Sequence, residues 1–301
     1  MRVTVTGATG LIGRRLIAAL QARGDEVTVL SRDPARARVA LGEVEAHAWN
    51  AVDDAAPTAA LSGRDGVVHL AGESIAQRWS EESKRRILAS REIGTRNLVA
   101  GMAAAEPRPR VLVSASGVGY YGPRGDEPLT EDAAPGDDFV AHLCIAWERE
   151  AQAAVTLGAR VVNLRTAVVL DKSGGALAKM LPFFRLGIGG PVAGGRQYLA
   201  WLHADDAVGL YLAALDDDSW TGPFNAGAPD PPTNRDFSRA LGRALRRPAF
   251  APVPGLAVRL LYGDMAEIVT EGQRAVPKRA LEHGYAFRQT DLDAALRDAL
   301  R

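Results

Sequence analysis

The chain has 301 residues, 47% hydrophobic and 24% charged, and its 36 basic and 36 acidic side chains give a formal net charge of zero. This balance is typical of a globular protein and predicts neither a nucleic-acid partner nor a membrane partner. No apolar run approaches the roughly 20 residues that span a bilayer, and the N-terminus has no signal-peptide pattern, so we expect a cytoplasmic protein. The single cysteine, Cys144, excludes an intrachain disulfide, and the five histidines lack metal-ligand spacing, so no metal is predicted.

Short, mostly Val-rich segments alternate with longer helical patterns over the first 165 residues. The predicted strands are Arg2–Thr6, Glu26–Leu30, Val44–Ala48, Gly66–Leu70, Arg110–Ser114 and Arg160–Arg165. The predicted helices are Leu11–Arg23, Ser80–Ala105 and Asp137–Leu157. Strands of nearly continuous apolar character, separated by helices, predict an α/β fold with a doubly wound, Rossmann-type parallel sheet.

The pattern changes after Arg165, where glycine and proline become dense between Gly174 and Gly195. Helices are expected after Trp201-Leu-His203, from about Thr233 to Arg246, and from Asp291 onward. We expect this part to form a smaller, mixed α/β lobe over the carboxyl edge of the sheet. The predicted domains are therefore 1–165, completed by sheet segments from the following region, and 166–301, which includes a short C-terminal domain from about 250.

A glycine segment, Gly7-Ala-Thr-Gly10-Leu-Ile-Gly13, stands between the first predicted strand and the first predicted helix. Gly7 lets the chain turn off the strand, Gly10 lets the backbone approach a pyrophosphate, and Gly13 lets the helix pack close to the sheet. The free N–H groups at the start of the helix then face the phosphates. Because the motif sits in the strand–turn–helix context that it needs, we predict a bound dinucleotide rather than a turn without a ligand.

The end of the second predicted strand favours NADP(H) over NAD(H). NAD sites place an acidic residue there, whereas Ser31-Arg32 stands there in this chain. Arg32 can bind a 2′-phosphate, and Asp33 before Pro34 is typical of a helix N-cap. The predicted cofactor-binding residues are Gly7, Thr9, Gly10, Leu11, Ile12, Gly13, Ser31, Arg32, Leu70, Ala71, Gly72 and Ser114. The first domain is thus interpreted as the NADP-binding domain and the second as the substrate lobe.

Longer segments carry a family resemblance. The G-x-x-G-x-x-G spacing resembles the short-chain dehydrogenase/reductase superfamily, in particular its extended, epimerase-like branch. Val67-Val-His-Leu-Ala-Gly72 resembles the fourth strand of that branch. Ser114-Ala-Ser-Gly-Val-Gly-Tyr-Tyr-Gly122 resembles its fifth strand and active-site loop, and Trp201-Leu-His203 followed by Asp205-Asp206 resembles its second-lobe motif.

The resemblance implies a Tyr-x-x-x-Lys pair, in which the lysine lowers the tyrosine pKa and holds the nicotinamide ribose. No such pair occurs in the chain. A glutamate follows the lysine by four residues in this branch, and Glu148 is the natural match. Counting back from it places Cys144 at the lysine position and Val140 at the tyrosine position.

This absence narrows the resemblance to the atypical epimerase-like family. The segments that carry it are Leu70-Ala-Gly-Glu-Ser-Ile75, Arg78-Trp79, Leu143-Cys-x-x-Trp-Glu148, Gly189-Gly-Pro191, Gly195-Arg-Gln197, Trp201-Leu-His203 and Glu271-Gly-Gln273. The resemblance runs essentially end to end and implies an NADP-binding protein with a short C-terminal domain of unassigned function. Such a resemblance does not by itself establish an activity.

Four residues are candidates for catalysis: Ser116, Tyr120 and Tyr121 after the fifth strand, and Glu73 after the fourth. An unassisted phenol with a pKa near 10 is a poor acid or base at neutral pH, so aromatic packing is the alternative for the tyrosines. A helix-cap acid is the alternative for Glu73. For His203, a helix cap is favoured over a catalytic acid. Cationic helpers are Lys84, Arg91 and Arg196.

We therefore expect an NADP-dependent, oxidoreductase-like protein of the epimerase branch. It would reduce a carbonyl or alkene of a small polar metabolite, because a neutral hydroxyl can still donate a proton without the Tyr-x-x-x-Lys pair. The alternatives are a non-catalytic, redox-responsive NADP-binding regulator and a redox-neutral epimerase of nucleotide sugars. The sequence identifies neither the substrate nor the oligomeric state, and a homodimer stays open.

Overall fold

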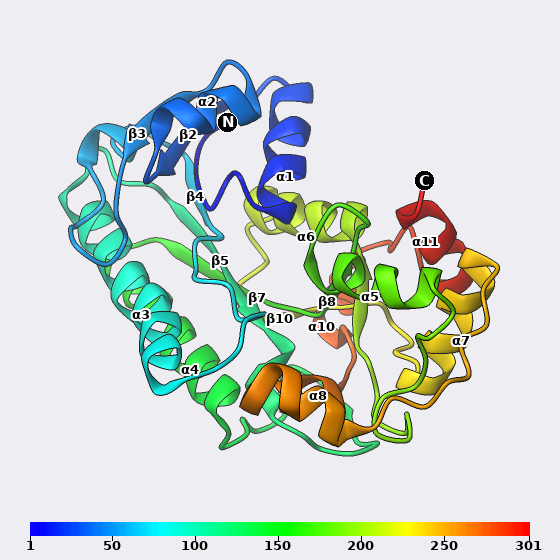
Figure 1. Ribbon diagram of the computed structural model, residues 1–301. Helices are drawn as coiled ribbons and strands as arrows, with labels where there is room; N and C mark the ends of the chain where they lie inside the picture. The colour runs from blue at the N-terminus through cyan, green and yellow to red at the C-terminus, as the bar shows by residue number, and fades with distance from the viewer.

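A computed structural model describes residues 1–301, apart from the side chain of Leu261. Its main sheet has the strand order β10-β7-β5-β4-β1-β2-β3, and all neighbouring strands are parallel (Figure 1). The strands are β1 (Arg2–Thr6), β2 (Glu26–Ser31), β3 (Glu45–Ala48), β4 (Gly66–His69), β5 (Val111–Gly117), β7 (Arg160–Thr166) and β10 (Gly222–Ala226). The predicted parallel sheet is confirmed, and β10 joins it from the later part of the chain.

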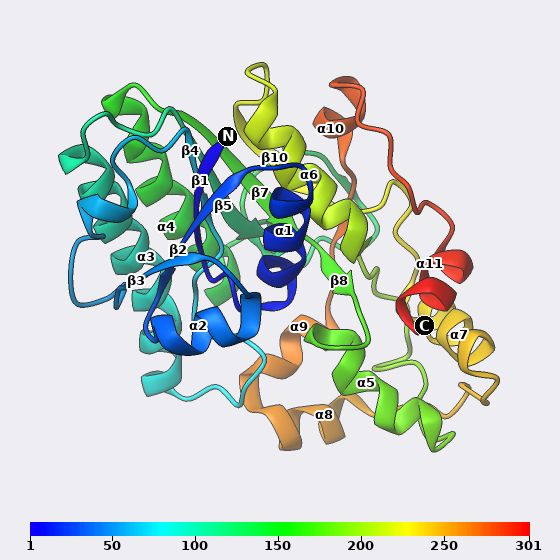
Figure 2. The same cartoon turned by 90° about the horizontal axis from the view of Figure 1, so that it is seen from above.

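Helices cover both faces of the sheet (Figure 2). The elements of this layered part are α1 (Leu11–Ala22), α2 (Pro34–Leu41), η1 (Thr58–Ala60), α3 (Glu81–Ala104), η2 (Val118–Tyr121), α4 (Phe139–Gln152), η3 (Ala153–Leu157) and α6 (Ala204–Asp216). Successive residues of β4 point to opposite faces, as the period of a strand requires. Val68 packs in the core that contains Leu16 and Leu210, on the side of α1 and α6. Val67 packs in the core that contains Leu98, on the side of α3.

The chain reverses its direction across the sheet beside β1. From β1 it runs outward through β2 to β3, and then returns to place β4 on the other side of β1. Open α/β sheets bind ligands outside the carboxyl ends of the strands at such a point. The register aligns Thr6 of β1 with His69 of β4, and His69 with Ser114 of β5. The residues that follow these strands therefore form the candidate site.

The remaining elements form a smaller, mixed α/β lobe, as predicted. Its two short sheets pair β8 (Val168–Leu170) with β9 (Trp201–His203), and β6 (Pro128–Leu129) with β11 (Arg274–Ala275). Its helices are α5 (Gly175–Arg185), α7 (Asn234–Leu245), α8 (Gly255–Tyr262), η4 (Gly263–Met265), α9 (Ala266–Thr270), α10 (Lys278–Glu282) and α11 (Leu292–Ala299). Leu177, Phe184, Phe237 and Leu296 unite α5, α7 and α11 in one apolar core.

The structure departs from the sequence predictions in a few elements. β5 continues to Gly117 rather than ending at Ser114, because its last residues pair with β7 as far as Thr166. Helix α5, in the glycine- and proline-rich segment, was not predicted, and neither were α8, α9 and α10. Among the described residues, no helix combines the length and apolar character needed to cross a membrane. The domain boundary at 165 stays a prediction.

Candidate cofactor and active site

The glycine segment forms a tight turn between β1 and α1. Gly7 has φ +65°, and a Cβ on it would lie 2.6 Å from the carbonyl carbon of Leu70. A Cβ on Gly13 would lie 2.5 Å from the carbonyl oxygen of Gly7. A Cβ on Gly10 would meet only that oxygen, at 3.2 Å. Gly7 and Gly13 are therefore required by the fold itself, whereas Gly10 keeps its outer side open.

The N-terminus of α1 is suited to bind an anion. Its N-cap, Gly10, makes no side-chain hydrogen bond, and the first turn contains no acidic residue. The first backbone N–H groups, from Leu11 and Ile12 onward, thus have no capping side chain and carry the positive end of the helix dipole. Thr9 is exposed beside them, and its carbonyl accepts a hydrogen bond from Arg14 Nε at 2.8 Å. These features fit a pyrophosphate at the predicted place.

The end of β2 presents Ser31 and Arg32 as expected. Ser31 Oγ donates to the carbonyl of Asp33 and is half-buried. Asp33 caps α2 by accepting the N–H of Arg36 at 2.9 Å, which confirms its predicted role. The Asp33 carboxylate is thus already hydrogen-bonded to the first turn of α2. Arg32 is exposed and remains the cation next to the end of β2.

The turn after β4 is pinned to β1. Thr6 Oγ1 accepts the N–H groups of Leu70 and Ala71 at 3.2 and 3.1 Å, and lies 2.8 Å from His69 Nδ1. Burial, together with the nearby Arg91, lowers the pKa of His69 to about 3, so this residue is neutral and structural. The backbone of Leu70–Gly72 is thus fixed next to the glycine turn. Ser114 is fully buried within β5, behind this edge.

Glu73 follows this turn and is held mainly through its backbone. Its N–H donates to Ser90 Oγ at 2.9 Å, and its carbonyl accepts from Arg91 Nη1 at 2.9 Å. Its half-buried carboxylate accepts only a long bond of 3.4 Å from Gln77 among the described residues. Glu73 therefore retains a carboxylate that can still bind a ligand.

Ser116 belongs to a buried charged network. Its Oγ donates to Glu148 Oε1 at 2.7 Å, and the Glu148 carboxylate accepts Arg165 Nε and Nη2 at 2.8 and 2.9 Å. The Arg165 side chain is 4% exposed. Burial alone lowers the pKa of Arg165, but its hydrogen bonds to Glu148 raise it overall. The Ser116 hydroxyl proton is directed to a carboxylate, so this residue ties β5 to α4.

The two tyrosines of η2 have different surroundings. The fully buried Tyr121 hydroxyl donates to Asn225 Oδ1 at 2.6 Å and accepts from Arg165 Nη1 at 3.0 Å. Burial raises the pKa of Tyr121 to about 12. Tyr120 is half-buried, and the Arg165 guanidinium carbon lies 3.4 Å from its ring centroid. This geometry disfavours Tyr121 as a proton donor to substrate, because its proton is bound to Asn225, and leaves Tyr120 as the more accessible phenol.

Val140 and Cys144 lie one turn apart on α4 and face the loop after β5. A Cβ on Gly119 would collide with Val140 Cγ1, and one on Gly117 would lie 3.7 Å from Cys144 Sγ. Burial, reinforced by the charge of Glu148, raises the pKa of Cys144 to about 11, so the group is a neutral thiol. Both positions of the expected pair thus lie beside the end of β5, but neither carries an acid or base active at neutral pH.

An apolar cluster covers the tyrosine position. Its buried members are Trp79, Ile87, Leu143 and Met265, and its half-buried members include Phe139, Val140, Tyr262 and Val269. Lys84 binds Asp264 at 2.8 Å beside this cluster, and this hydrogen bond raises the Lys84 pKa. The segment from α8 to α9 is therefore attached to α3 and α4 by both apolar and ionic contacts.

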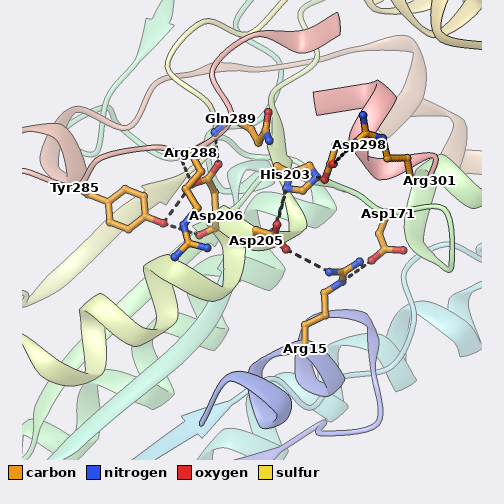
Figure 3. Close-up of polar contacts among 10 residues, drawn as sticks. All are labelled: Arg15, Asp171, His203, Asp205, Asp206, Tyr285, Arg288, Gln289, Asp298 and Arg301. Carbon is orange, nitrogen blue, oxygen red and sulfur yellow. Dashed lines mark hydrogen bonds and ion pairs between the residues drawn. The ribbon is translucent and has the colours of Figure 1, made fainter. Parts of the chain in front are cut away.

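Figure 3 shows the polar contacts where α1 meets the smaller lobe. Arg15 of α1 reaches Asp171 at 2.7 Å and Asp205 at 3.3 Å. His203 Nδ1 accepts the N–H of Asp205 at 3.3 Å, which confirms His203 as the N-cap of α6. His203 Nε2 lies 3.3 Å from Asp298 Oδ2 on α11. These contacts tie the cofactor helix and the C-terminal helix to the same point.

Ligand atoms of His203, Asp205 and Asp298 lie within 4.8 Å of one another. Both ring nitrogens of His203 already have partners in the protein, Nδ1 in the N–H of Asp205 and Nε2 in the Asp298 carboxylate. The same contacts explain the cluster as a helix cap and a link to α11. The cluster of His203, Asp205 and Asp298 therefore gives no reason to propose a metal site.

Sequence reasoning missed the partner of Glu148. Arg165 was predicted only as the last residue of a strand. An acidic residue on a helix followed by an arginine at the end of the next strand could have indicated an ion pair between the two. Asn225, which binds Tyr121, had no signal because β10 was not predicted. Arg91 was considered only as one of several cationic helpers, since its burial depends on the packing of α3 against α4.

Comparisons with known proteins agree with this architecture. Residues 3–227 match the NAD dependent epimerase/dehydratase family, and residues 253–299 match a domain of unknown function, DUF1731. The chain is 40% identical over 299 residues to the Arabidopsis thaliana "Epimerase family protein SDR39U1 homolog, chloroplastic". This match covers 99% of this chain and 86% of the relative. It is 39% identical over 306 residues to epimerase family protein SDR39U1 of Bos taurus, which covers 100% of both chains.

A solved structure extends the comparison to three dimensions. The crystal structure of human epimerase family protein SDR39U1 with NADPH matches with a TM-score of 0.88 and 36% identity, and the match covers 99% of each chain. The likeness therefore includes both the parallel sheet and the smaller lobe. This chain belongs to the NAD dependent epimerase/dehydratase family, as an atypical, epimerase-like member of the short-chain dehydrogenase/reductase superfamily.

Proposed function

We propose that this protein is an NADPH-dependent reductase that acts on a carbonyl or activated alkene of a small polar metabolite. The observation that carries the proposal is the burial of Tyr121 and Cys144 beside η2, with the Tyr121 hydroxyl bonded to Asn225. Burial holds Tyr121 and Cys144 in their neutral forms, with pKa values of about 12 and 11. Oxidation of an alcohol needs a base that accepts a proton, whereas reduction needs only a donor. The site is therefore better suited to reduction.

The choice of NADPH is supported by two independent features. Arg32 is an exposed cation at the end of β2, where a 2′-phosphate would lie, and Asp33 is occupied as the cap of α2. The crystal structure of the human relative contains NADPH. The uncapped N-terminus of α1 and the open side of Gly10 would hold the pyrophosphate.

NADPH, when bound, would supply the hydride for the electrophilic carbon of the substrate. A proton must then reach the carbonyl oxygen, or the neighbouring carbon of an activated alkene. Tyr120 is the donor that the geometry favours, since it lies on η2 and its hydroxyl is not committed to Asn225 as that of Tyr121 is. The network of Ser116, Glu148 and Arg165 would position this loop, and the Glu73 carboxylate would orient a polar substrate.

The test follows NADPH absorbance during incubation with a panel of aldehydes, ketones and activated alkenes. We expect Tyr120→Phe to lower the reduction rate at least about tenfold, as loss of a general acid does, with NADPH affinity unchanged. Ser116→Ala should lower the rate through its effect on the loop. Robust alcohol oxidation at neutral pH that survives both changes would refute this active site.

A non-catalytic NADPH-binding regulator is the second candidate. The observation that favours it is the apolar cluster at the tyrosine position, where Val140 packs near Tyr262 and Met265. NADPH binding without turnover of any member of the panel, together with an NADPH-dependent change in proteolysis of α8, would favour this candidate. A substrate whose reduction depends on Tyr120 would exclude it.

A further inference from the structure

Arg91 of α3 is a buried cation without a hydrogen-bonded carboxylate, although the charge of the nearby Glu73 partly offsets the effect of burial on its pKa. Arg91 is 9% exposed, and no ion pair among the described residues includes it. Within the described part of the chain its hydrogen bonds all come from Nη1, which donates to the carbonyl of Glu73 at 2.9 Å, to the carbonyl of Ile87 at 3.3 Å and to Ser90 Oγ at 3.3 Å. Buried charges are normally paired, because removing an unpaired charge from water is costly. A cation in this position therefore calls for a further partner.

The guanidinium lies between the turn after β4 and helix α4. A Cβ on Gly72 would lie 3.0 Å from Arg91 Cζ, so the backbone passes directly over the guanidinium. On α4, the ring centroid of Trp147 lies 4.8 Å from the same carbon. Arg91 and Cys144 are near enough for the charge of each to affect the pKa of the other. Burial lowers the pKa of Arg91 to about 10, which leaves it positively charged at neutral pH.

Part of the guanidinium remains available to a ligand. Nη2 makes no hydrogen bond within the described residues, yet it is not among the side-chain atoms that are both buried and unpartnered. It is therefore not fully enclosed by the protein. A guanidinium N–H can donate to a hydroxyl oxygen, so a ribose hydroxyl is a suitable acceptor for this group.

We propose that Arg91 holds the nicotinamide ribose, in place of the lysine that Cys144 replaces. The cation would reach the cofactor from α3 and beneath Gly72, rather than from α4. This inference rests on the proposed binding of NADPH. Arg91 is thus a cofactor-positioning residue, and its contribution belongs to the nicotinamide half of NADPH and not to the adenosine half.

The experiment compares two ligands. Adenosine 2′,5′-bisphosphate carries the adenosine and 2′-phosphate of NADPH but lacks the nicotinamide ribose. In Arg91→Met, the affinity for NADPH should fall about tenfold or more, as expected for loss of charge-assisted hydrogen bonds, while the affinity for the bisphosphate should stay within about twofold. The melting temperature without ligand should not fall, because methionine removes an unpaired buried charge.

The matched control is Arg86→Met on the same helix. Arg86 is 51% exposed and pairs with Glu82, so neither affinity should change. Should Arg91→Met fail to fold, Arg91→Gln serves the same comparison, because glutamine keeps a donor without the charge. Titrations followed by NADPH fluorescence, and competition by the bisphosphate, supply both affinities.

The outcomes separate this inference from the proposed function. Equal losses for both ligands, or an unchanged NADPH affinity in Arg91→Met, would overturn the role of Arg91 alone. Wild-type protein that binds neither ligand would overturn the proposed function and this inference together. A selective loss of NADPH affinity at an unchanged melting temperature would support the inference, since a merely structural arginine would not produce it.

Discussion

Replacing Glu148 by glutamine tests whether the network below Tyr120 depends on a buried charge pair. Glu148 binds Arg165 through two hydrogen bonds of 2.8 and 2.9 Å, and the Arg165 side chain is 4% exposed. Glutamine has nearly the same shape but no charge, so the buried guanidinium would lose its carboxylate. Breaking a buried pair from one side costs about 3–5 kcal/mol, and the acceptor that glutamine keeps favours the lower end, about 3 kcal/mol.

This free energy converts into a measurable melting shift. At about 2.1 cal/mol/K of unfolding entropy per residue over 301 residues, a loss of about 3 kcal/mol lowers the Tm by about 5 °C. Calorimetry at pH 7 measures it, on variants without ligand. Two-state melting has to hold for the conversion, and agreement of the calorimetric and van't Hoff enthalpies checks that condition.

Glu150→Gln is the matched control on the same helix. The Glu150 side chain is 12% exposed, close to the 13% of Glu148, but its partners Arg96 and Arg149 are 53% and 60% exposed. Those arginines would return to water, so the loss should be at most about 1 kcal/mol, or less than about 2 °C. Equal shifts for the two variants, or a shift below about 2 °C for Glu148→Gln, would refute the argument from the burial of the partner.

Other predictions concern the cofactor and the single thiol. Arg32→Glu should weaken NADPH by at least about tenfold relative to NADH, because a like charge would face the 2′-phosphate; parallel losses for both cofactors in fluorescence titrations would contradict it. Gly13→Ala should lower the Tm strongly, since its Cβ would lie 2.5 Å from Gly7 O, whereas Gly10→Val should fold and lose NADPH binding. A Gly10→Val variant with wild-type NADPH affinity would rule out the proposed cradle. Burial raises the pKa of the Cys144 thiol to about 11, and only the thiolate reacts with a thiol reagent. At pH 8 Cys144 should therefore react about 100-fold more slowly in the native protein than in the unfolded protein. Comparable reaction rates would show that Cys144 is not buried.

The predictable part of the fold is the part that local patterns encode. The β1–α1 unit follows from a Val-rich strand, a glycine turn and a helical apolar period. Asp33 and His203 were identified as helix caps from their immediate neighbours, and both make the expected bonds. These signals lie within a few residues of one another in the chain, so no tertiary information was needed.

The rest depended on contacts that local patterns do not encode. Helix α5 includes Pro182, which disfavours a helix, but Leu177 and Phe184 of the same helix are buried in the lobe core. Burial of that apolar face outweighs the local preference. β5 extends beyond Ser114 because β7 offers it hydrogen-bonding partners, and the small residues at its end carry no strand signal of their own.

The candidate site also has a part that local sequence patterns encode and a part that depends on tertiary contacts. The glycine turn and the residues after β2 could be predicted as cofactor-binding residues because a phosphate cradle is a property of one strand–turn–helix unit. The buried arginines could not, since Arg165 and Arg91 become informative only once helices α3 and α4 are packed against the sheet. Counting along the sequence assigned Val140 and Cys144 to the positions of the absent pair, and the structure places both beside the end of β5. Counting could not say what fills the space that the pair leaves.

The structure connects the loss of that pair with the C-terminal domain. Val140 packs against an apolar cluster to which Tyr262, Met265 and Val269 contribute, and a tyrosine there would bring a hydroxyl next to that cluster. A buried hydroxyl without a partner costs about 1–3 kcal/mol, so this cluster favours valine there. A lysine at position 144 would in turn bring a second cation close to Arg91, and like charges in a buried site repel each other strongly. The apolar covering from the C-terminal domain and the arginine from α3 thus each disfavour one member of the usual pair. The absence of tyrosine and lysine is therefore consistent with a site rebuilt around other groups, and it does not by itself indicate a site that has decayed.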